Sequence, residues 1–392
     1  MSKPFQYPPP EILDEIVDFL RDEPETLMQC CLVSKSWVPR ARKHLFAQIW
    51  VKADDHRKWT SIFPDPEGSP AHYTRRLKVD CALEDSRWIQ GFRRVEQLTL
   101  NCIPPDPDTG IVSLIPFRIL ATSLRSLCVY SGIIPHSQTF GLIRSLPLLE
   151  DLTLRGNDID EESMRPSMTV PPSTSPAVTG SLKLFMYEGM ENALREMLDL
   201  PGGLHFRELQ LTWCGKSEFP WVAKLVATCS DTLECLDITC DIDSMSDLVP
   251  SIDEILQSPS GDEGVPGPID LSKATKLKDI VFRCDSACCG WVTATLGTIT
   301  PEHQDLRISL CVPRVSNHQM NNPQAIGAEN TGMSWLDLDH SLVRLWESHS
   351  ISLTVVNPQV GEGAKGLIEY LLPEVTRRGI AELEEFNYIN DY

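Results

Sequence analysis

The sequence predicts an α/β solenoid, in which a short helical segment precedes a long, mostly parallel sheet. Two observations lead to this fold class. The pattern L-x-x-L-x-L recurs along the chain, and each copy is long enough for one short strand. Between the copies lie segments that can return the chain to the start of the next parallel strand as helix or loop. Hydrophobic side chains make up 42% of the 392 residues, which excludes a largely disordered chain.

Seven copies of the pattern follow one another between residues 95 and 282. The segment 149–157 matches the full pattern L-x-x-L-x-L-x-x-N, whereas Leu182-x-x-Phe185-x-Tyr187 is a weaker copy. Most steps between copies are close to the period of about 20–29 residues that is typical of leucine-rich repeats. Two longer steps contain Pro-, Ser- and Gly-rich insertions at 166–181 and 258–268, which predict loops. The central apolar residues of the copies are Leu98, Leu127, Leu152, Phe185, Leu209, Leu236 and Ile280.

Further segments extend the array at both ends. Strand-like residues occur at 49–51, 77–79, 306–310 and 351–355, and the polar stretch 315–334 predicts a loop. Residues 365–378 are amphipathic despite Pro373, so we expect a helix there that caps the open end of the solenoid.

Residues 8–50 predict three short helices. The first carries one broad apolar face, and Pro24 among carboxylates is a typical start for the second. Ser34 or Ser36 can cap the third. About 40 residues are too few to bury so much apolar surface alone, so we expect a partner to cover part of it. The apolar face of the first helix contains Ile12, Leu13, Ile16, Val17 and Leu20.

Net charge and the distribution of apolar residues indicate which kinds of binding partner and which cell compartment to expect for this chain. A formal net charge of -20 argues against nucleic acid as the main partner, because binding phosphates requires clustered Lys and Arg. No apolar run is long enough for a membrane-spanning helix, so we expect no membrane partner. The N-terminus lacks the apolar core of a secretory signal. We therefore expect the thirteen cysteines to be reduced thiols and the location to be cytoplasmic, nuclear or both.

Motifs that carry chemistry are sparse. Gly361, Gly363 and Gly366 match G-x-G-x-x-G between a predicted strand and a predicted helix. Too few residues follow to build a dinucleotide-binding fold, so we interpret the motif as an ordinary strand-to-helix turn. The cysteines form no C-x-x-C pair, and no serine has a nucleophile-elbow motif. We expect no cofactor, no metal and no catalytic residue, and hence a chain that is not an enzyme.

The N-terminal helices resemble an F-box. Residues 9–16 (PPEILDEI) follow the family pattern L-P-x-E-[IL]-[LI]-x-x-I, and residues 32–37 (LVSKSW) follow L-V-[CS]-[KR]-x-W. Pro8 stands where the family has Leu, a departure that would weaken the first contact with a partner. Together with the repeats, the chain resembles F-box proteins with divergent leucine-rich repeats, which are abundant in fungi.

This resemblance implies the substrate-recognition subunit of an SCF-type ubiquitin ligase. The F-box, residues 1–50, would dock on a Skp-type adaptor that joins cullin and RING subunits. The repeats, residues 51–360, would bind an unknown protein substrate, and residues 361–392 would form the C-terminal cap. A non-degradative F-box and repeat scaffold is the alternative. The adaptor-binding residues implied by the motif are Pro9, Ile12, Leu13, Ile16, Leu20, Leu27, Leu32, Val33, Trp37 and Leu45.

Charged residues between the repeat leucines suggest a substrate surface. In each strand the leucines point inward and the residues between them face the open side. Acidic residues outnumber Arg155 and Arg283 at these positions. They either serve solubility or form an acidic groove that binds a basic substrate segment. The acidic residues are Asp151, Glu188, Glu208, Asp237 and Asp279.

Overall fold

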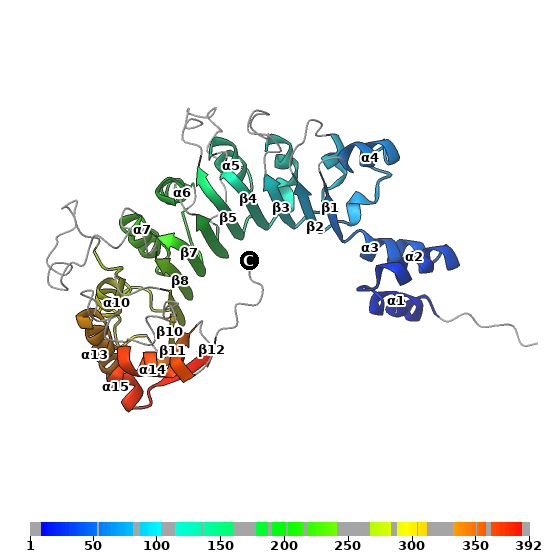
Figure 1. Cartoon of the computed structure of the whole chain (residues 1–392). Helices are drawn as coiled ribbons and strands as arrows, with labels where there is room; N and C mark the ends of the chain where they lie inside the picture. The colour runs from blue at the N-terminus through cyan, green and yellow to red at the C-terminus, as the bar shows by residue number, and fades with distance from the viewer. Residues whose placement is uncertain are drawn as a thin grey trace, which may run out of the picture. The chain divides into compact units, whose positions relative to one another are not determined.

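The computed structural model has an α/β fold built on a parallel sheet (Figure 1). Among the residues it describes, twelve strands, β1 to β12, follow the order of the sequence. The predicted α/β class with a mostly parallel sheet is therefore confirmed. The described residues are 9–52, 55–80, 87–102, 114–134, 136–159, 178–186, 190–200, 203–214, 218–240, 267–283, 288–303, 305–311, 332–349, 351–357 and 362–385.

The chain divides into two compact units, Met1–Pro176 (unit 1) and Ala177–Tyr392 (unit 2). The domain limits predicted at residues 50 and 360 stay predictions. Unit 1 contains α1 (Pro10–Phe19), α2 (Pro24–Val33), α3 (Val38–Leu45), β1 (Gln48–Val51), α4 (Asp55–Ile62), β2 (Arg76–Asp80), β3 (Gln97–Cys102), β4 (Ser126–Ile134), α5 (His136–Ile143) and β5 (Asp151–Ile159). It also has 3-10 helices at Pro70–Tyr73, Arg87–Gly91 and Ile115–Thr122.

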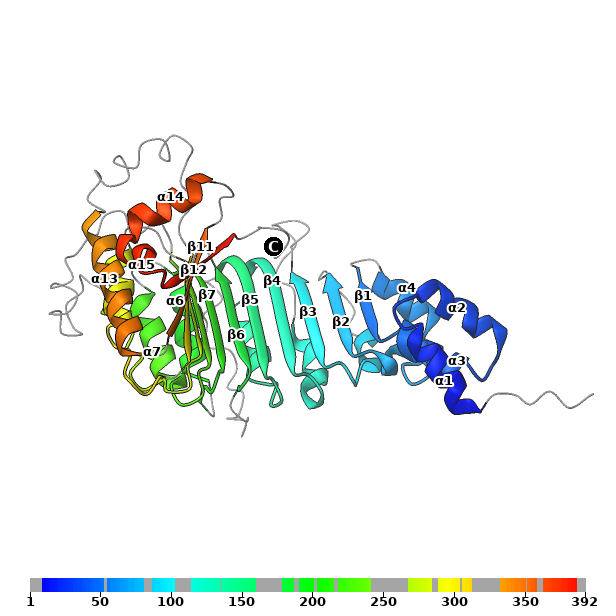
Figure 2. The ribbon, with the colours of Figure 1, turned by 90° about the horizontal axis from the view of Figure 1, so that it is seen from below.

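Unit 2 continues the alternation of strands and helices. Figure 2 shows its strands side by side, with α13 next to α14 and α15. Its elements are β6 (Ser181–Met186), α6 (Met190–Leu198), β7 (Glu208–Cys214), α7 (Phe219–Cys229), β8 (Cys235–Cys240), β9 (Asp279–Arg283), α10 (Cys289–Leu296), β10 (Leu306–Cys311), α13 (Gly332–Ser348), β11 (Ile351–Asn357), α14 (Glu362–Leu371), α15 (Pro373–Arg377) and β12 (Ala381–Glu385).

The core consists of apolar rows that run across the strands. Each inward residue pairs in register with the inward residue of the next strand, and burial of these side chains is the main favourable contribution to folding. In unit 1 one row contains Leu77, Leu98, Leu127 and Leu152, all buried. In unit 2 the corresponding row contains Leu182, Leu209, Leu236, Ile280, Ile308 and Leu353, also buried.

A repeated backbone interaction sets the register of these rows. Just before a strand begins, one carbonyl oxygen accepts hydrogen bonds from two successive N–H groups at the start of the next strand. This arrangement leaves little freedom for one strand to slip along its neighbour. In unit 1 the accepting carbonyls belong to Ala47, Arg75, Glu96 and Arg125, and in unit 2 to Gly180, Arg207 and Glu234.

The weak repeat at β6 has a different alignment from the one predicted. Leu182 pairs with Leu209 and is buried, whereas Phe185 is half-buried and pairs with Thr212 on the other face of the sheet. The centre of this repeat is therefore residue 182. The prediction placed the centre at Phe185 because this large apolar residue follows Leu182 by three residues, the spacing of the pattern.

The C-terminal region contains more elements than the sequence predicted. The single helix expected over 365–378 is two helices, α14 and α15, because Pro373 starts a new helix at its first turn. Beyond them β12 pairs in parallel with β11. A capping role for this region stays a prediction. The insertions at 166–181, 258–268 and 315–334 lie largely outside the described residues.

A buried carboxylate ties α13 to α15 within unit 2. Asp339 of α13 is fully buried. Its Oδ2 accepts a hydrogen bond from the Glu374 N–H at 2.9 Å, and its Oδ1 accepts one from the Val375 N–H, also at 2.9 Å. These N–H groups belong to the first turn of α15 and have no carbonyl partner within that helix. Asp339 therefore satisfies the start of α15 from a neighbouring helix.

We expect Asp339→Ala to lower the free energy of unfolding by about 2 kcal/mol, because two buried N–H groups lose a carboxylate acceptor. Urea unfolding of the full chain measures this change. Asp337→Ala on the same helix is the matched control and should stay within about 0.5 kcal/mol of the parent. Equal stability of the two variants would show that Asp339 does not hold α15 in place.

Candidate protein-interaction site

The three N-terminal helices pack around a very small core of their own. The fully buried apolar residues are Val17 from α1, Leu27 and Cys30 from α2, and Ala41 from α3. Partly buried residues complete this core from its edge, namely Leu20, Cys31, Trp37 and Leu45. Four of the predicted adaptor-binding residues thus hold the helices together: Leu27 lies in the core, and Leu20, Trp37 and Leu45 border it.

A second apolar set on the same helices faces the solvent. Ile12 and Ile16 are each 45% exposed, and Leu32 and Val33 at the end of α2 are 81% and 70% exposed. Of the other predicted residues, Pro9 is exposed and Leu13 is half-buried. We call Ile12, Ile16, Phe19, Met28, Leu32 and Val33 the exposed apolar set.

Phe19 and Met28 belong to this set although the motif did not assign them. Phe19 is 88% exposed, and it follows Ile16 by three residues and Ile12 by seven, which places all three on one side of a helix. That spacing was visible in the sequence. The predicted apolar face placed Ile12 and Ile16 together with Val17 and left out Phe19. In the structure Val17 points into the core, and Ile12, Ile16 and Phe19 do not.

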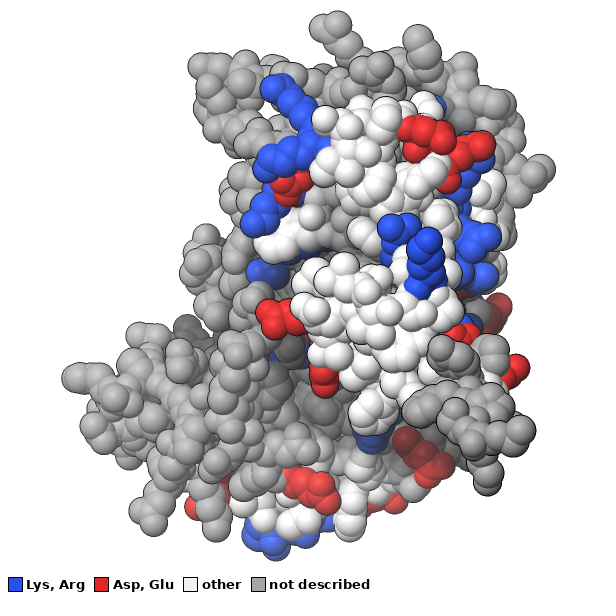
Figure 3. All heavy atoms as spheres, turned by 90° about the vertical axis from the view of Figure 1, so that its right-hand side faces the viewer, with Lys and Arg blue, Asp and Glu red and all other residues white. Residues whose placement is uncertain are grey.

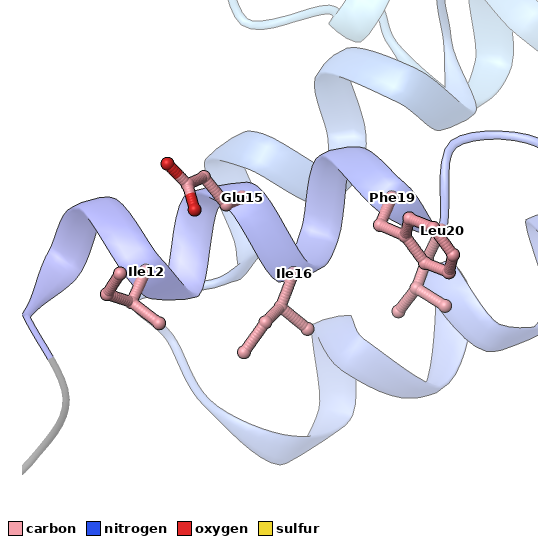
Figure 4. Close-up of a pocket in the computed structure, with 5 residues that line it drawn as sticks. All are labelled: Ile12, Glu15, Ile16, Phe19 and Leu20. Carbon is pink, nitrogen blue, oxygen red and sulfur yellow. The ribbon is translucent and has the colours of Figure 1, made fainter.

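A shallow hollow of about 260 Å³ lies along α1. In Figure 4, Ile12 and Ile16 project from one side of the helix, whereas Glu15 projects from the other. Phe19 and Leu20 complete the lining. In Figure 3, uncharged residues occupy most of the described surface on the side where the N-terminal helices lie. The apolar character of the hollow itself comes from Ile12, Ile16, Phe19 and Leu20.

A charged cluster holds α1 against α3 beside this surface. The Arg40 Nε donates a hydrogen bond to Asp18 Oδ1 at 2.5 Å, and the Arg40 Nη2 donates one to Asp18 Oδ2. The His44 Nε2 lies 2.7 Å from Asp18 Oδ1. The Arg40 guanidinium, helped by His44 and opposed by desolvation, holds the pKa of Asp18 well below its usual range. The cluster sets the angle at which α1 presents its apolar residues.

The acidic residues predicted to bind substrate are mostly paired with cations. Glu208 Oε1 lies 3.1 Å from Lys183 Nζ, Asp237 Oδ2 lies 2.9 Å from Arg283 Nη2, and Asp279 Oδ1 lies 2.5 Å from Arg307 Nε. Each pair joins two neighbouring strands of unit 2. Asp151 begins β5 in unit 1, so it lies in the other unit, and Glu188 lies outside the described residues. Within the described part of unit 2, Glu208, Asp237 and Asp279 are therefore each compensated by a cation, and their role in substrate binding stays a prediction.

The glycine motif predicted to form a strand-to-helix turn lies mostly within a helix. Gly363 and Gly366 belong to α14, which begins at Glu362, so these glycines form helix and not a turn or a phosphate-binding loop. Burial raises the pKa of the Cys229 thiol to about 11, which makes it a weak nucleophile. Among the described residues, no group of three or more His, Cys, Asp or Glu side chains could hold a metal ion.

Among the described residues, no helix is both long and apolar enough to cross a bilayer.

Comparison with known proteins does not assign the chain to a family. A scan against protein-family models found no match, and a search of curated proteins found none either.

The Asp18 cluster predicts a pH dependence of the helical segment. Because the pKa of Asp18 is lowered in the folded state, its stabilising effect is complete above the ordinary Asp pKa of about 4 and is lost as the pH falls below it. We expect Asp18→Asn to lose protection of residues 10–45 in hydrogen–deuterium exchange at pH 7, corrected for intrinsic rates. The difference from the parent should shrink toward pH 2–3.

The size of this effect is limited because both partners are partly exposed, so about 1 kcal/mol or less is expected. Glu15→Gln on the exposed side of α1 makes the same chemical change and serves as the control. Equal protection of the Asp18→Asn variant and the parent at pH 7 would contradict the assigned role of the cluster.

Proposed function

We propose that this chain is the substrate-recognition subunit of an SCF-type ubiquitin ligase, in which α1 to α3 form an F-box that docks on a Skp-type adaptor. The adaptor would connect the chain to cullin and RING subunits, and the strand-bearing part would bind a protein substrate. The observation that carries the proposal is the exposed apolar set on helices whose sequence follows the F-box pattern.

The exposed apolar set favours a protein partner on energetic grounds. Burying one large apolar side chain is worth about 1.5–3 kcal/mol, and Phe19, Leu32 and Val33 are each more than two-thirds exposed. Contiguous apolar patches on a protein surface commonly mark interaction sites. The internal core, with four fully buried residues, leaves these side chains uncovered.

The segment that follows α2 explains how the motif separates inward from outward residues. The Trp37 N–H donates a hydrogen bond to the Ser34 carbonyl at 3.1 Å, and the Ser36 N–H donates one to Ser34 Oγ at 3.3 Å. This turn ends α2 directly after Leu32 and Val33, which stay exposed, and brings Trp37 to the edge of the core. Serine thus shapes the turn; neither serine caps α3, which starts after Trp37 without a side-chain cap.

The helices pass almost directly into the first strand of unit 1. The Ala47 carbonyl, between α3 and β1, accepts hydrogen bonds from the N–H groups of Arg75 and Arg76 at 2.9 and 3.0 Å. The same interaction that sets the register between strands therefore begins within two residues of α3. A subunit that must hold a substrate at a defined position relative to an adaptor benefits from such a short connection.

The proposal predicts that exposed residues of α1 and α2 control adaptor binding. We expect Phe19→Asp and Leu32→Asp each to weaken binding to a Skp-type adaptor by about 30-fold or more, the effect of losing about 2 kcal/mol at a central interface residue. Both positions are largely exposed, so the helices should remain folded. Co-purification and titration of the purified full chain with the adaptor measure the change.

Ile62→Asp is the matched control, because Ile62 on α4 is 67% exposed and lies outside the exposed apolar set. Trp37→Ala is less informative, because Trp37 packs against the small core. Normal adaptor binding by both the Phe19 and the Leu32 variants would refute the F-box assignment. Recovery of adaptor without cullin would instead favour the non-degradative scaffold.

A further inference from the structure

An exposed tryptophan on the first strand of unit 1 lies between two lysines. Trp50 of β1 is 52% exposed and pairs in register with Lys78 of β2. The Lys78 Nζ lies 4.5 Å from the centroid of the Trp50 ring, and the Lys52 Nζ lies 4.9 Å from it. We call Trp50, Lys52, Arg76 and Lys78 the Trp50 surface. We infer that this surface binds an acidic segment of a protein partner.

The orientation of the indole ring is held by hydrogen bonds on the same face. Trp50 Nε1 donates to Asp80 Oδ2 at 3.0 Å, and Asn101 Nδ2 donates to Asp80 Oδ1 at 2.7 Å. Positions 76, 78 and 80 alternate with the buried Leu77 and Val79, so their side chains share the exposed face of β2. A large exposed ring that is already oriented loses little conformational freedom on binding.

The charge of this surface is the opposite of the charge of the chain. Within the described residues, Lys52, Arg76 and Lys78 form no ion pair with a carboxylate. Asp80 lies on the same face and keeps its negative charge, because hydrogen bonds from the uncharged Trp50 and Asn101 donors do not neutralise it. Lys52 also interacts electrostatically with Asp55. Among the described residues, the three cations still outnumber Asp80 on this face, so on a chain of net charge -20 they form a local site for a negatively charged ligand.

The strands of unit 2 provide the contrast. The carboxylates of Glu208, Asp237 and Asp279, on β7, β8 and β9, are each paired with a lysine or arginine. A partner segment with Asp or Glu side chains, and an apolar or aromatic residue to contact the ring, is complementary to the Trp50 surface. A nucleic acid needs more clustered Lys and Arg than these three cations to neutralise its run of phosphates, which favours a short acidic segment of a protein.

The role of this segment as a ubiquitination substrate rests on the proposed function, but its binding does not require the adaptor. The test is a titration of the full chain with a short fluorescein-labelled peptide rich in Glu and Phe, followed by fluorescence anisotropy. We expect Lys52→Ala/Lys78→Ala and Trp50→Ala each to weaken binding by about tenfold or more. Raising the salt concentration should weaken binding to the parent chain.

The chain offers a matched control on a helix of unit 2. Arg195 and Lys224 flank the Trp221 ring at 4.9 and 4.8 Å, so Arg195→Ala/Lys224→Ala removes the same charge from a similar arrangement. This variant should bind the acidic peptide as the parent does. Circular dichroism of each variant checks that it is folded, and Lys52→Gln/Lys78→Gln, which keeps most of each side chain, replaces an unfolded double variant.

The outcomes distinguish the inference from the proposed function. No binding of the acidic peptide, tighter binding of a Lys-rich peptide or a single-stranded RNA, or equal losses in the test and control variants would each overturn the inference. If the chain binds the adaptor but not the peptide, the F-box assignment stands and only the inferred binding of an acidic segment to the Trp50 surface is refuted. If the chain binds the peptide but not the adaptor, the inferred binding stands and its role in ubiquitination is refuted.

Discussion

Within each unit, the strand-bearing part of the structure depends on the parallel pairing of each strand with the next. One carbonyl before a strand accepts two N–H groups from the start of its neighbour, and this interaction recurs from Ala47 to Glu234. Because side chains alternate between the two faces of a strand, this register aligns every second residue into buried apolar rows. The residues between them face the solvent. The polar face can therefore differ in chemistry from strand to strand while the core remains constant.

Much of the strand pattern could be predicted from the sequence, because burial on one face imposes a leucine at every second position. The strand β12 could not, because its residues AELEE offer one leucine among carboxylates, and pairing with β11 is what makes it a strand. The long helix α13 was not predicted either, because it lies outside the segments that contain the repeat pattern. The spacing of apolar residues therefore predicts the strands that bury a full apolar face. Elements without such a face, like β12, become strands only through pairing with a neighbour.

The interaction surfaces were less predictable than the fold. The F-box-like motif covers α1 to α3, and the first helix carries apolar residues on two sides. Sequence spacing alone does not tell which of these sides packs into the internal core. Cross-strand pairs are harder still, since Arg283 and Asp237 are distant in sequence and become neighbours only through the register of β8 and β9. The sequence therefore does not show that Asp237 and Arg283 lie side by side, and such pairs reduce the net charge of the exposed face.

The join between β8 and β9 has an evolutionary consequence. Residues 241–278 separate these strands, far more than most neighbouring strands require, and yet Leu236 pairs with Ile280 in the usual register. The ends of the strands, and not the length of the connection, decide the pairing. Because the entropic cost of closing a loop grows only by about 0.6 kcal/mol for each doubling of its length, such a join tolerates insertions. It is a place where the lineage of this protein can gain new segments, and where an engineer can insert a reporter domain, without changing the order of the sheet.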